Sequence, residues 1–207
     1  MVIRPSSLRS RQFHLQAYRL RENHFSVTFY ETKLLGAFEI RLDLKADERG
    51  FFARSWCQTE FEEHGLNQKL VQCSISFNAR KGTLRGIHYQ AAPSPEAKLV
   101  RCTKGAIYDV VVDLRPQSPT YKQWIGAILT AENRRMLYVP EKCGHGFLTL
   151  EDETEVFYQM SEFYCPELSR GVRWNDQSFQ IAWPGEVKVI SERDRTYPNF
   201  EQVQCVC

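Results

Sequence analysis

The chain has 207 residues, of which 43% are hydrophobic, 25% charged and 13% aromatic, and its formal net charge at pH 7 is +2. This balance is typical of a single globular domain, and it gives no reason to expect a nucleic acid as partner, because nucleic-acid binding needs a strongly basic surface. No apolar run approaches the roughly 18 residues of a membrane-spanning helix, so no membrane partner is expected.

Residues 1–25 differ in composition from the rest of the chain. They contain five arginines and three serines, with no acidic residue before Glu22. This bias is found in organelle transit peptides, but it equally fits a dispensable basic extension or a start codon placed too far upstream, and we favour this plainer interpretation. We expect the compact domain to cover residues 26–200, followed by a tail over residues 201–207.

Short strands and turns are predicted along most of the domain. Residues 35–44 alternate apolar and polar side chains from Phe38 onward, which predicts a half-buried strand, and a polar turn follows at residues 47–50. Residues 59–64 predict a short helix with Thr59 as N-cap and Gly65 at its end. Residues 70–77 have strand composition again.

Residues 82–90, Gly-Thr-Leu-Arg-Gly-Ile-His-Tyr-Gln, predict a strand that is entered through a tight turn. Gly86 gives room for the backbone to bend or for a ligand to approach. His88 is the one residue there that can take and return a proton near neutral pH. A lone strand histidine is more often structural, so this stretch does not establish catalysis by itself.

Further strands are predicted over residues 99–103, 106–114, 124–129, 136–139, 144–150 and 155–160. Lys104 and Gly105 form a hairpin-like connection between the first two. Strands at spacings near ten residues, with almost no helix, predict an all-β, antiparallel β-sandwich or barrel. Alternation within Val156, Tyr158 and Met160 directs Tyr158 inward.

The seven cysteines are mostly scattered singly, which favours reduced thiols and a cytoplasmic location. Cys205 and Cys207 could form a metal or redox pair, but no second Cys or His pair accompanies them.

Several motifs together carry a resemblance to a known family. They are Thr83–Gln90, Lys98–Arg101, Asp109–Asp113, Ala131–Arg135, Pro140–Phe147, Phe157–Tyr158, Arg173–Asp176 and Ser191–Asp194. From about Glu31 to Pro198 the chain resembles the dTDP-4-dehydrorhamnose 3,5-epimerase family. The resemblance implies a cupin-like jelly roll with a few short peripheral helices, usually dimeric and working without a metal or organic cofactor.

The resemblance also implies a catalytic set. Inverting C3 and C5 of a nucleoside-diphosphate 4-keto-6-deoxyhexose requires a base on one face of the sugar, an acid on the other, and a cation near the enolate. His88 matches the family's base, Asp194 the carboxylate that orients it, and Tyr158 the acid. Lys98 matches a lysine near the ketone oxygen, and His145 matches a second histidine that would hydrogen-bond the sugar.

Four more residues match substrate contacts of the family. Arg49 and Arg85 match arginines that bind the diphosphate, and Arg49 lies on a strand that in the family reaches into the partner subunit's site. Tyr164 matches the tyrosine that stacks on the nucleobase, and Gln72 matches a polar contact to the base or ribose.

Each assignment has a plainer alternative. Tyr158 could be a core tyrosine, Lys98 an exposed strand charge, and Asp194 a surface residue in a turn. Singly these alternatives would be preferred, but the joint set with His88 favours catalysis.

The sequence departs from the family at three places near the nucleotide. Arg54 stands where close members of the family carry Glu, Cys73 and Ser74 stand for Asp-Asn, and Ser169 stands for Glu. The proton-transfer set is intact, so the reaction type is better determined than the nucleotide, and a nucleotide other than dTDP is a hypothesis to test.

Three other functions compete with a double epimerase. A metal-dependent cupin oxygenase would need a His-x-His cluster, whereas Cys143 and His145 are the one close pair here. A non-catalytic sugar-nucleotide-binding cupin would bind without proton exchange. A mono-epimerase acting at C3 or C5 alone is the closest alternative, because one base and one acid serve both positions.

Overall fold

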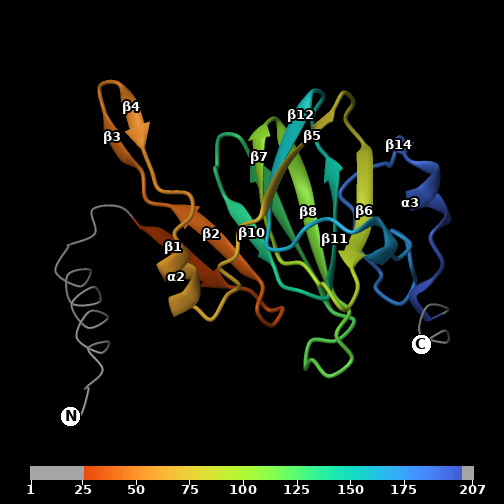
Figure 1. Cartoon of the computed structure of the whole chain (residues 1–207). Helices are drawn as coiled ribbons and strands as arrows, with labels where there is room; N and C mark the ends of the chain where they lie inside the picture. Colours follow the sequence, from red (N-terminus) through yellow and green to blue (C-terminus); the bar gives the residue numbers. More distant parts are fainter. Residues whose placement is uncertain (1–25, 202–207) are drawn as a thin grey trace, which may run out of the picture.

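Two antiparallel β-sheets face each other in the computed structural model, which describes residues 26–201 (Figure 1). The first sheet has the order β1 (Val27–Glu31), β2 (Phe38–Leu42), β10 (Met136–Val139), β7 (Lys98–Lys104), β12 (Thr154–Met160) and β5 (Gln72–Asn78). The second has the order β13 (Ser169–Gly171), β6 (Thr83–Gln90), β11 (Cys143–Thr149), β8 (Ala106–Asp113) and β9 (Trp124–Thr130). The short β14 (Val189–Ile190) pairs with β6 in parallel. The predicted all-β antiparallel sandwich is confirmed.

The main core lies between the two sheets. Because successive strand residues point to opposite faces, alternate positions of β7, β8, β11 and β12 meet there. The fully buried side chains of this layer include Val100, Ile107, Val111, Phe147 and Val156. Tyr158 packs against the same cluster, which confirms that it points inward.

Two further apolar layers cover the outer faces of the sheets. Helix α2 (Gln58–Glu63) places Phe61 over the outer face of the first sheet, against Ile40 and Met136. The C-terminal segment covers the second sheet and includes η1 (Pro166–Leu168) and α3 (Glu192–Thr196). No helix among residues 26–201 is long and apolar enough to span a membrane.

Two local predictions were wrong. The N-cap of α2 is Cys57, not Thr59, so the helix begins earlier than its sequence signature indicates. Lys104 and Gly105 do not close a hairpin, because β7 belongs to the first sheet and β8 to the second. A short glycine-containing loop permits either a hairpin or a corner between sheets. The strands that β7 pairs with determine which forms, and these are β10 and β12, which are distant in sequence.

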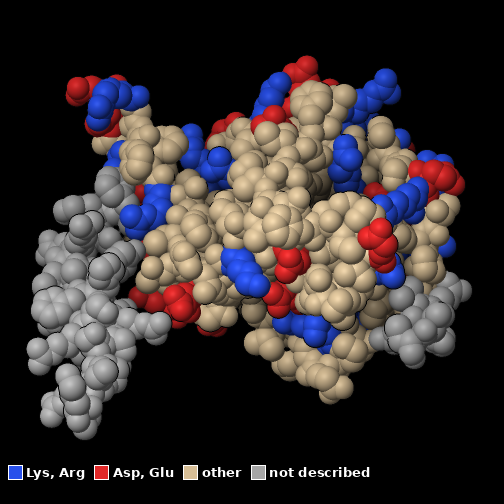
Figure 2. Space-filling model, viewed as in Figure 1, with Lys and Arg blue, Asp and Glu red and all other residues tan. Residues whose placement is uncertain are grey.

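A small hairpin of β3 (Lys45–Asp47) and β4 (Gly50–Phe52) extends away from the sandwich (Figure 1). Gly50 at its turn has a φ of 125°, which favours glycine. Phe51 and Phe52 are exposed by 46% and 63%. Figure 2 shows acidic and basic groups together at the hairpin tip and few charges over the middle of this face, where β5 and β12 run.

Strands β6 and β11 approach each other closely at two glycines. A Cβ at Gly86 would collide with the backbone of Gly146, and the strand register shifts between His145 and Phe147. The φ of Gly86 is 132°, so the predicted bend is present, and it accommodates a neighbouring strand. The same pairing places His88 directly opposite His145.

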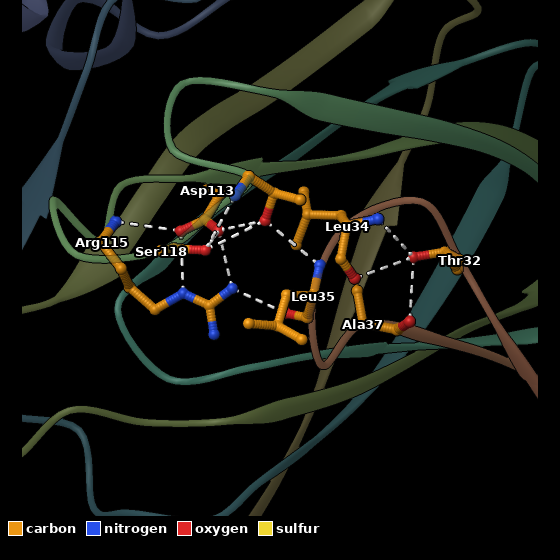
Figure 3. Close-up of polar contacts among 8 residues, drawn as sticks. Thr32, Leu34, Leu35, Ala37, Asp113, Arg115 and Ser118 are labelled. Carbon is orange, nitrogen blue, oxygen red and sulfur yellow. Dashed lines mark hydrogen bonds and ion pairs between the residues drawn. The ribbon is translucent and has the colours of Figure 1, made fainter.

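A buried carboxylate ties the loop before β9 to the turn after β1 (Figure 3). Asp113 is fully buried and accepts hydrogen bonds from Ser118 Oγ at 2.5 Å, Thr120 Oγ1 at 2.6 Å and Arg115 Nη2 at 2.7 Å. Arg115 in turn donates to the carbonyl of Leu35. Burial alone would raise the pKa of Asp113, but these hydrogen bonds outweigh it and lower the pKa to about 2.

We predict that Asp113→Asn lowers the free energy of unfolding by about 3 kcal/mol at neutral pH, because it leaves Arg115 without its counter-ion. A lowered pKa stabilises the fold above the ordinary carboxyl pKa, and this contribution is lost as pH falls from about 4 to about 2. The difference between wild type and variant should therefore shrink over that range. Urea unfolding at a series of pH values measures it.

Asp43→Asn is the matched control, since its ion pair with Lys45 is partly exposed. It should change the free energy of unfolding by less than about 1 kcal/mol. An Asp113→Asn protein as stable as wild type at pH 7 would contradict the assignment.

Candidate active site

The structure brings His88 and Asp194 together although 106 residues separate them. His88 Nε2 lies 2.7 Å from Asp194 Oδ1. His88 is half-buried on β6, whereas Asp194 is almost fully buried on α3. This pair leaves the other ring nitrogen, Nδ1, to meet a substrate.

Asp194 is held by two groups besides the imidazole ring, Gly86 and Ser191. Its Oδ2 accepts the N–H of Gly86 at 3.2 Å, and Ser191 caps α3 by accepting the N–H of Asp194 at 3.0 Å. Burial by itself would raise the pKa of Asp194, but the hydrogen bond and charge of His88, then Gly86 and Ser191, lower it below its usual value. The carboxyl group is therefore ionised and can stabilise an imidazolium.

A cavity of about 460 Å³ is lined by both His88 and Tyr158. His88 comes from β6 of the second sheet and Tyr158 from β12 of the first, so the two side chains enter from opposite sheets. Burial, followed by the nearby charge of Asp109, raises the pKa of Tyr158 above its usual value. The phenol is therefore neutral and can donate a proton.

Lys98 lines the same cavity and forms an ion pair that the sequence did not indicate. Its Nζ lies 2.9 Å from Glu96 Oε1, and the two side chains are only 13% and 10% exposed. The sequence feature that could have predicted this ion pair is an acid two residues before Lys98, namely Glu96 just before β7. The pair places a cation and its counter-ion beside Tyr158 and His88.

A second buried histidine–carboxylate pair lies behind Tyr158. His145 Nε2 is 2.8 Å from Asp109 Oδ1, and the rings of His145 and Tyr158 meet edge to face at 6.2 Å between centroids. The other oxygen of Asp109 is buried and has no hydrogen-bond partner among the described residues. His145 is buried and does not line the cavity of His88 and Tyr158, so its hydrogen bond to the sugar stays a prediction. Asp109 opens one of the family motifs but was not singled out as a site residue.

Tyr164 projects at the rim of the cavity, with 55% of its surface exposed, as a stacking platform would. Two glutamines hold the backbone on either side of it. Gln72 Oε1 accepts the N–H of Tyr164 at 2.5 Å, and Gln90 accepts the N–H of Cys165 at 2.8 Å while donating to the carbonyl of Phe163 at 3.0 Å. Gln72 thus has a positioning contact with Tyr164 in addition to its place in the cavity wall, and Gln90 is a supporting residue that sequence reasoning missed.

The two predicted diphosphate-binding arginines lie in different places. Arg85 lines a neighbouring cavity of about 420 Å³, which also contains His88 and Asp194, and it donates to Asn78 at 2.8 Å. Arg49 stands in the projecting β3–β4 hairpin with 83% of its side chain exposed, paired with Asp47. Arg49 lines neither of the two cavities, and Figure 1 shows its hairpin extending away from the sandwich.

The departures from the family separate into two groups. Ser74 and Ser169 line the cavity, and Ser169 Oγ accepts a hydrogen bond from Arg193 at 2.8 Å. Arg54 instead pairs with Glu60 of α2 at 3.0 Å, and Cys73 is exposed on the outer face of β5. The altered polar contacts at the cavity thus reduce to the two serines.

Among residues 26–201, no group of three or more His, Cys, Asp or Glu side chains is arranged to hold a metal ion. In the close pair of Cys143 and His145, burial raises the pKa of the Cys143 thiol to about 12. Cys205 and Cys207, a possible pair, lie outside the described residues.

The arrangement suits proton removal and return at a carbon held between two sheets. It offers an ionised carboxylate behind an imidazole, a neutral phenol on the opposite wall, and an ammonium group beside them. Such a set can form and quench an enolate without a redox group.

Comparison with known proteins gives one consistent family. The family model described as dTDP-4-dehydrorhamnose 3,5-epimerase matches residues 31–202. The enzyme of that name from Shigella flexneri is 43% identical over 175 residues, covering 84% of this chain and 91% of the relative.

Solved structures agree. The dTDP-4-dehydrorhamnose 3,5-epimerase of Bacillus anthracis, with TDP and PPi bound, has a TM-score of 0.81 and 41% identity over 84% of this chain and all of its own. The Legionella pneumophila enzyme in complex with dTDP-4-keto-L-rhamnose has a TM-score of 0.81 and 33% identity over 87% and 96%. A 3'-monoepimerase from Streptomyces bikiniensis, in complex with dTDP-quinovose, has a TM-score of 0.79 but 29% identity, over 86% and 90%. The predicted cupin-like fold is confirmed.

We predict that Gln90→Leu loosens the segment that carries Tyr164. The change removes three hydrogen bonds to main-chain groups of Ser94, Phe163 and Cys165, so the free energy of unfolding should fall by about 2 kcal/mol. Urea denaturation measures this fall, and limited proteolysis should cut the 163–165 segment faster. Gln177→Leu, at an exposed glutamine, is the control; equal effects of the two variants would contradict the role of Gln90.

Proposed function

The chain belongs to the dTDP-4-dehydrorhamnose 3,5-epimerase family and is a sugar-nucleotide epimerase, and we propose that it inverts C3 and C5 of a dTDP-4-keto-6-deoxyhexose with His88 as base and Tyr158 as acid. The observation that carries this proposal is the entry of His88, backed by Asp194, and of Tyr158 into one cavity from opposite sheets. The names of the relatives support dTDP as the nucleotide and rhamnose biosynthesis as the pathway.

The first step is proton removal from the carbon next to the ketone. Nδ1 of His88 takes the proton and becomes part of an imidazolium, whose charge Asp194 stabilises at 2.7 Å from the other nitrogen. The electron pair of the broken C–H bond moves to the ketone oxygen as an enolate. Lys98 supplies the nearby positive charge that this oxygen requires.

The second step returns a proton to the opposite face of the same carbon. Tyr158 gives its phenolic proton, the enolate collapses to the ketone, and the configuration is inverted. Tyr158 must regain a proton and His88 must lose one before the second carbon reacts. The raised pKa of Tyr158 favours this recovery of the neutral phenol.

Incubation of the purified protein with dTDP-4-keto-6-deoxyglucose in deuterated water tests the proposal. We expect NMR to show deuterium at both C3 and C5. Deuterium at one position alone would make the protein a mono-epimerase, and binding with no deuterium at either would make it a non-catalytic binding cupin. Poor turnover of the dTDP sugar beside efficient turnover of another nucleotide sugar would overturn dTDP.

Separate variants test the two proton-transfer residues. His88→Ala and Tyr158→Phe should each lower kcat by about 100-fold or more, because each removes a proton-transfer group. His64→Ala, at an exposed histidine, and Tyr108→Phe, in the outer apolar layer, are matched controls that should keep wild-type rates. A near-normal rate in either test variant removes that assignment.

We further propose that the working form is a homodimer in which Arg49 completes the partner subunit's site. Three features support this: the exposed Phe51 and Phe52 on the projecting hairpin, the exposed Ile75 and Phe77 on the outer face of edge strand β5, and the distance of Arg49 from its own cavity. Large apolar side chains on an edge strand normally meet a partner. The cytoplasmic location predicted from the cysteines stays a prediction.

Mixed dimers test this exchange directly. Arg49→Ala and His88→Ala homodimers should both be weakly active or inactive. Random reassociation of the two should restore about a quarter of the wild-type activity, because about half of the dimers would be mixed and each mixed dimer would contain one intact site of its two. With an affinity tag on one variant alone, co-purification of the untagged variant verifies the mixed dimer. Failure to regain activity from a verified mixed dimer would show that Arg49 serves its own chain or none.

A further inference from the structure

Tyr197, the residue that ends helix α3, lies against the imidazole of the proposed base. Its ring meets His88 edge to face, with 5.9 Å between centroids and an interplanar angle of 68°. Tyr197 contacts the His88 ring and is not among the residues that line the cavity of His88 and Tyr158. It belongs to none of the motifs that relate the chain to its family.

Two arginines contact Tyr197, one at its ring and one at its backbone carbonyl. The guanidinium of Arg193 lies 5.6 Å from the ring centroid, and Arg173 Nε donates to the carbonyl of Tyr197 at 3.0 Å. The phenolic oxygen is buried without a well-aligned hydrogen-bond partner among the described residues, and burial raises the pKa of Tyr197. The aromatic ring, not the hydroxyl group, therefore makes the defined contacts.

Gly171 makes room for this ring. It stands opposite His88 in the pairing of β13 with β6, and a Cβ at this position would overlap the ring carbons of Tyr197. A side chain at residue 171 would thus displace Tyr197. The space beside the imidazole, where a strand neighbour's side chain would stand, is filled by Tyr197 instead.

A base that serves two carbons needs a fixed ring plane as well as a fixed nitrogen. The bond to Asp194 fixes one nitrogen but leaves the imidazole free to tilt about that contact. A displacement of about 1 Å can cost a large factor in rate, because the reacting atoms must be aligned. An edge-to-face neighbour restricts such a tilt.

We propose that Tyr197 is a positioning residue for His88. Its ring, which packs against Gly171 and Arg193, keeps the plane of the imidazole ring aligned with the substrate. The inference rests on the proposed epimerase function for its kinetic consequence. The contact itself belongs to the free protein and can be observed without substrate.

The test is a double-mutant cycle with a conservative rescue. Tyr197→Ala should lower kcat about tenfold while KM changes less than about twofold, because substrate contacts remain. Tyr197→Phe should keep the wild-type kcat. Gly171→Ala should reproduce the loss by pushing the ring aside, yet add nothing in the Tyr197→Ala background, where no ring remains to be displaced.

NMR of the ligand-free protein supplies the readout that is independent of catalysis. The His88 ring protons should carry a ring-current shift in wild type and Tyr197→Phe, and lose it in Tyr197→Ala and Gly171→Ala. Tyr121→Ala, in the outer layer beside Phe200, controls for general loosening and should leave the shift unchanged.

The outcomes separate the two proposals. Absence of turnover in wild type, with the ring-current pattern as expected, overturns the epimerase function and keeps the contact. A Tyr197→Ala enzyme with wild-type kcat, a Tyr197→Phe enzyme as slow as Tyr197→Ala, or additive effects of Gly171→Ala and Tyr197→Ala would each overturn the positioning role.

Discussion

The 2.7 Å contact between His88 and Asp194 joins a strand inside the sandwich to a helix near the end of the chain. A buried carboxylate is tolerated only when its charge is met, and here the imidazole, the Gly86 N–H and the Ser191 cap share that task. The same contact anchors α3, and α3 brings Arg193 and Tyr197 to the site. The position of the C-terminal segment and the orientation of the His88 ring are thus joined by one hydrogen bond.

Much of the fold could be predicted from sequence because the strands alternate strongly. The ranges around β8, β11 and β12 were correct to within a residue or two, and Tyr158 points inward as its period indicates. The corner at Gly105 was mistaken for a hairpin, since the choice of partner depends on β10 and β12, which lie 30 to 60 residues away. Local sequence describes a turn but not which sheet the chain enters next.

The candidate site likewise contains residues that could be predicted from sequence and residues that could not. His88, Tyr158, Lys98 and Asp194 were found through the family's motifs, and the structure places all four at or beside one cavity. Glu96, Asp109, Gln90 and Tyr197 were not singled out, although Gln90 and Asp109 lie at the ends of two of these motifs, because their contacts are with other residues of the site. Motifs identify groups whose chemistry a reaction requires, whereas the partners that hold those groups depend on the packing of this particular chain.

The placement of His88 and Tyr158 on separate sheets has a consequence for the hydrophobic core. The gap between His88 and Tyr158 is set by how thickly Phe147, Val100 and their neighbours fill the space between the sheets. The core therefore acts as a spacer whose thickness fixes the width of the cavity between these two side chains. A change of core volume that leaves the protein folded would still alter the distance between the two side chains that line the cavity.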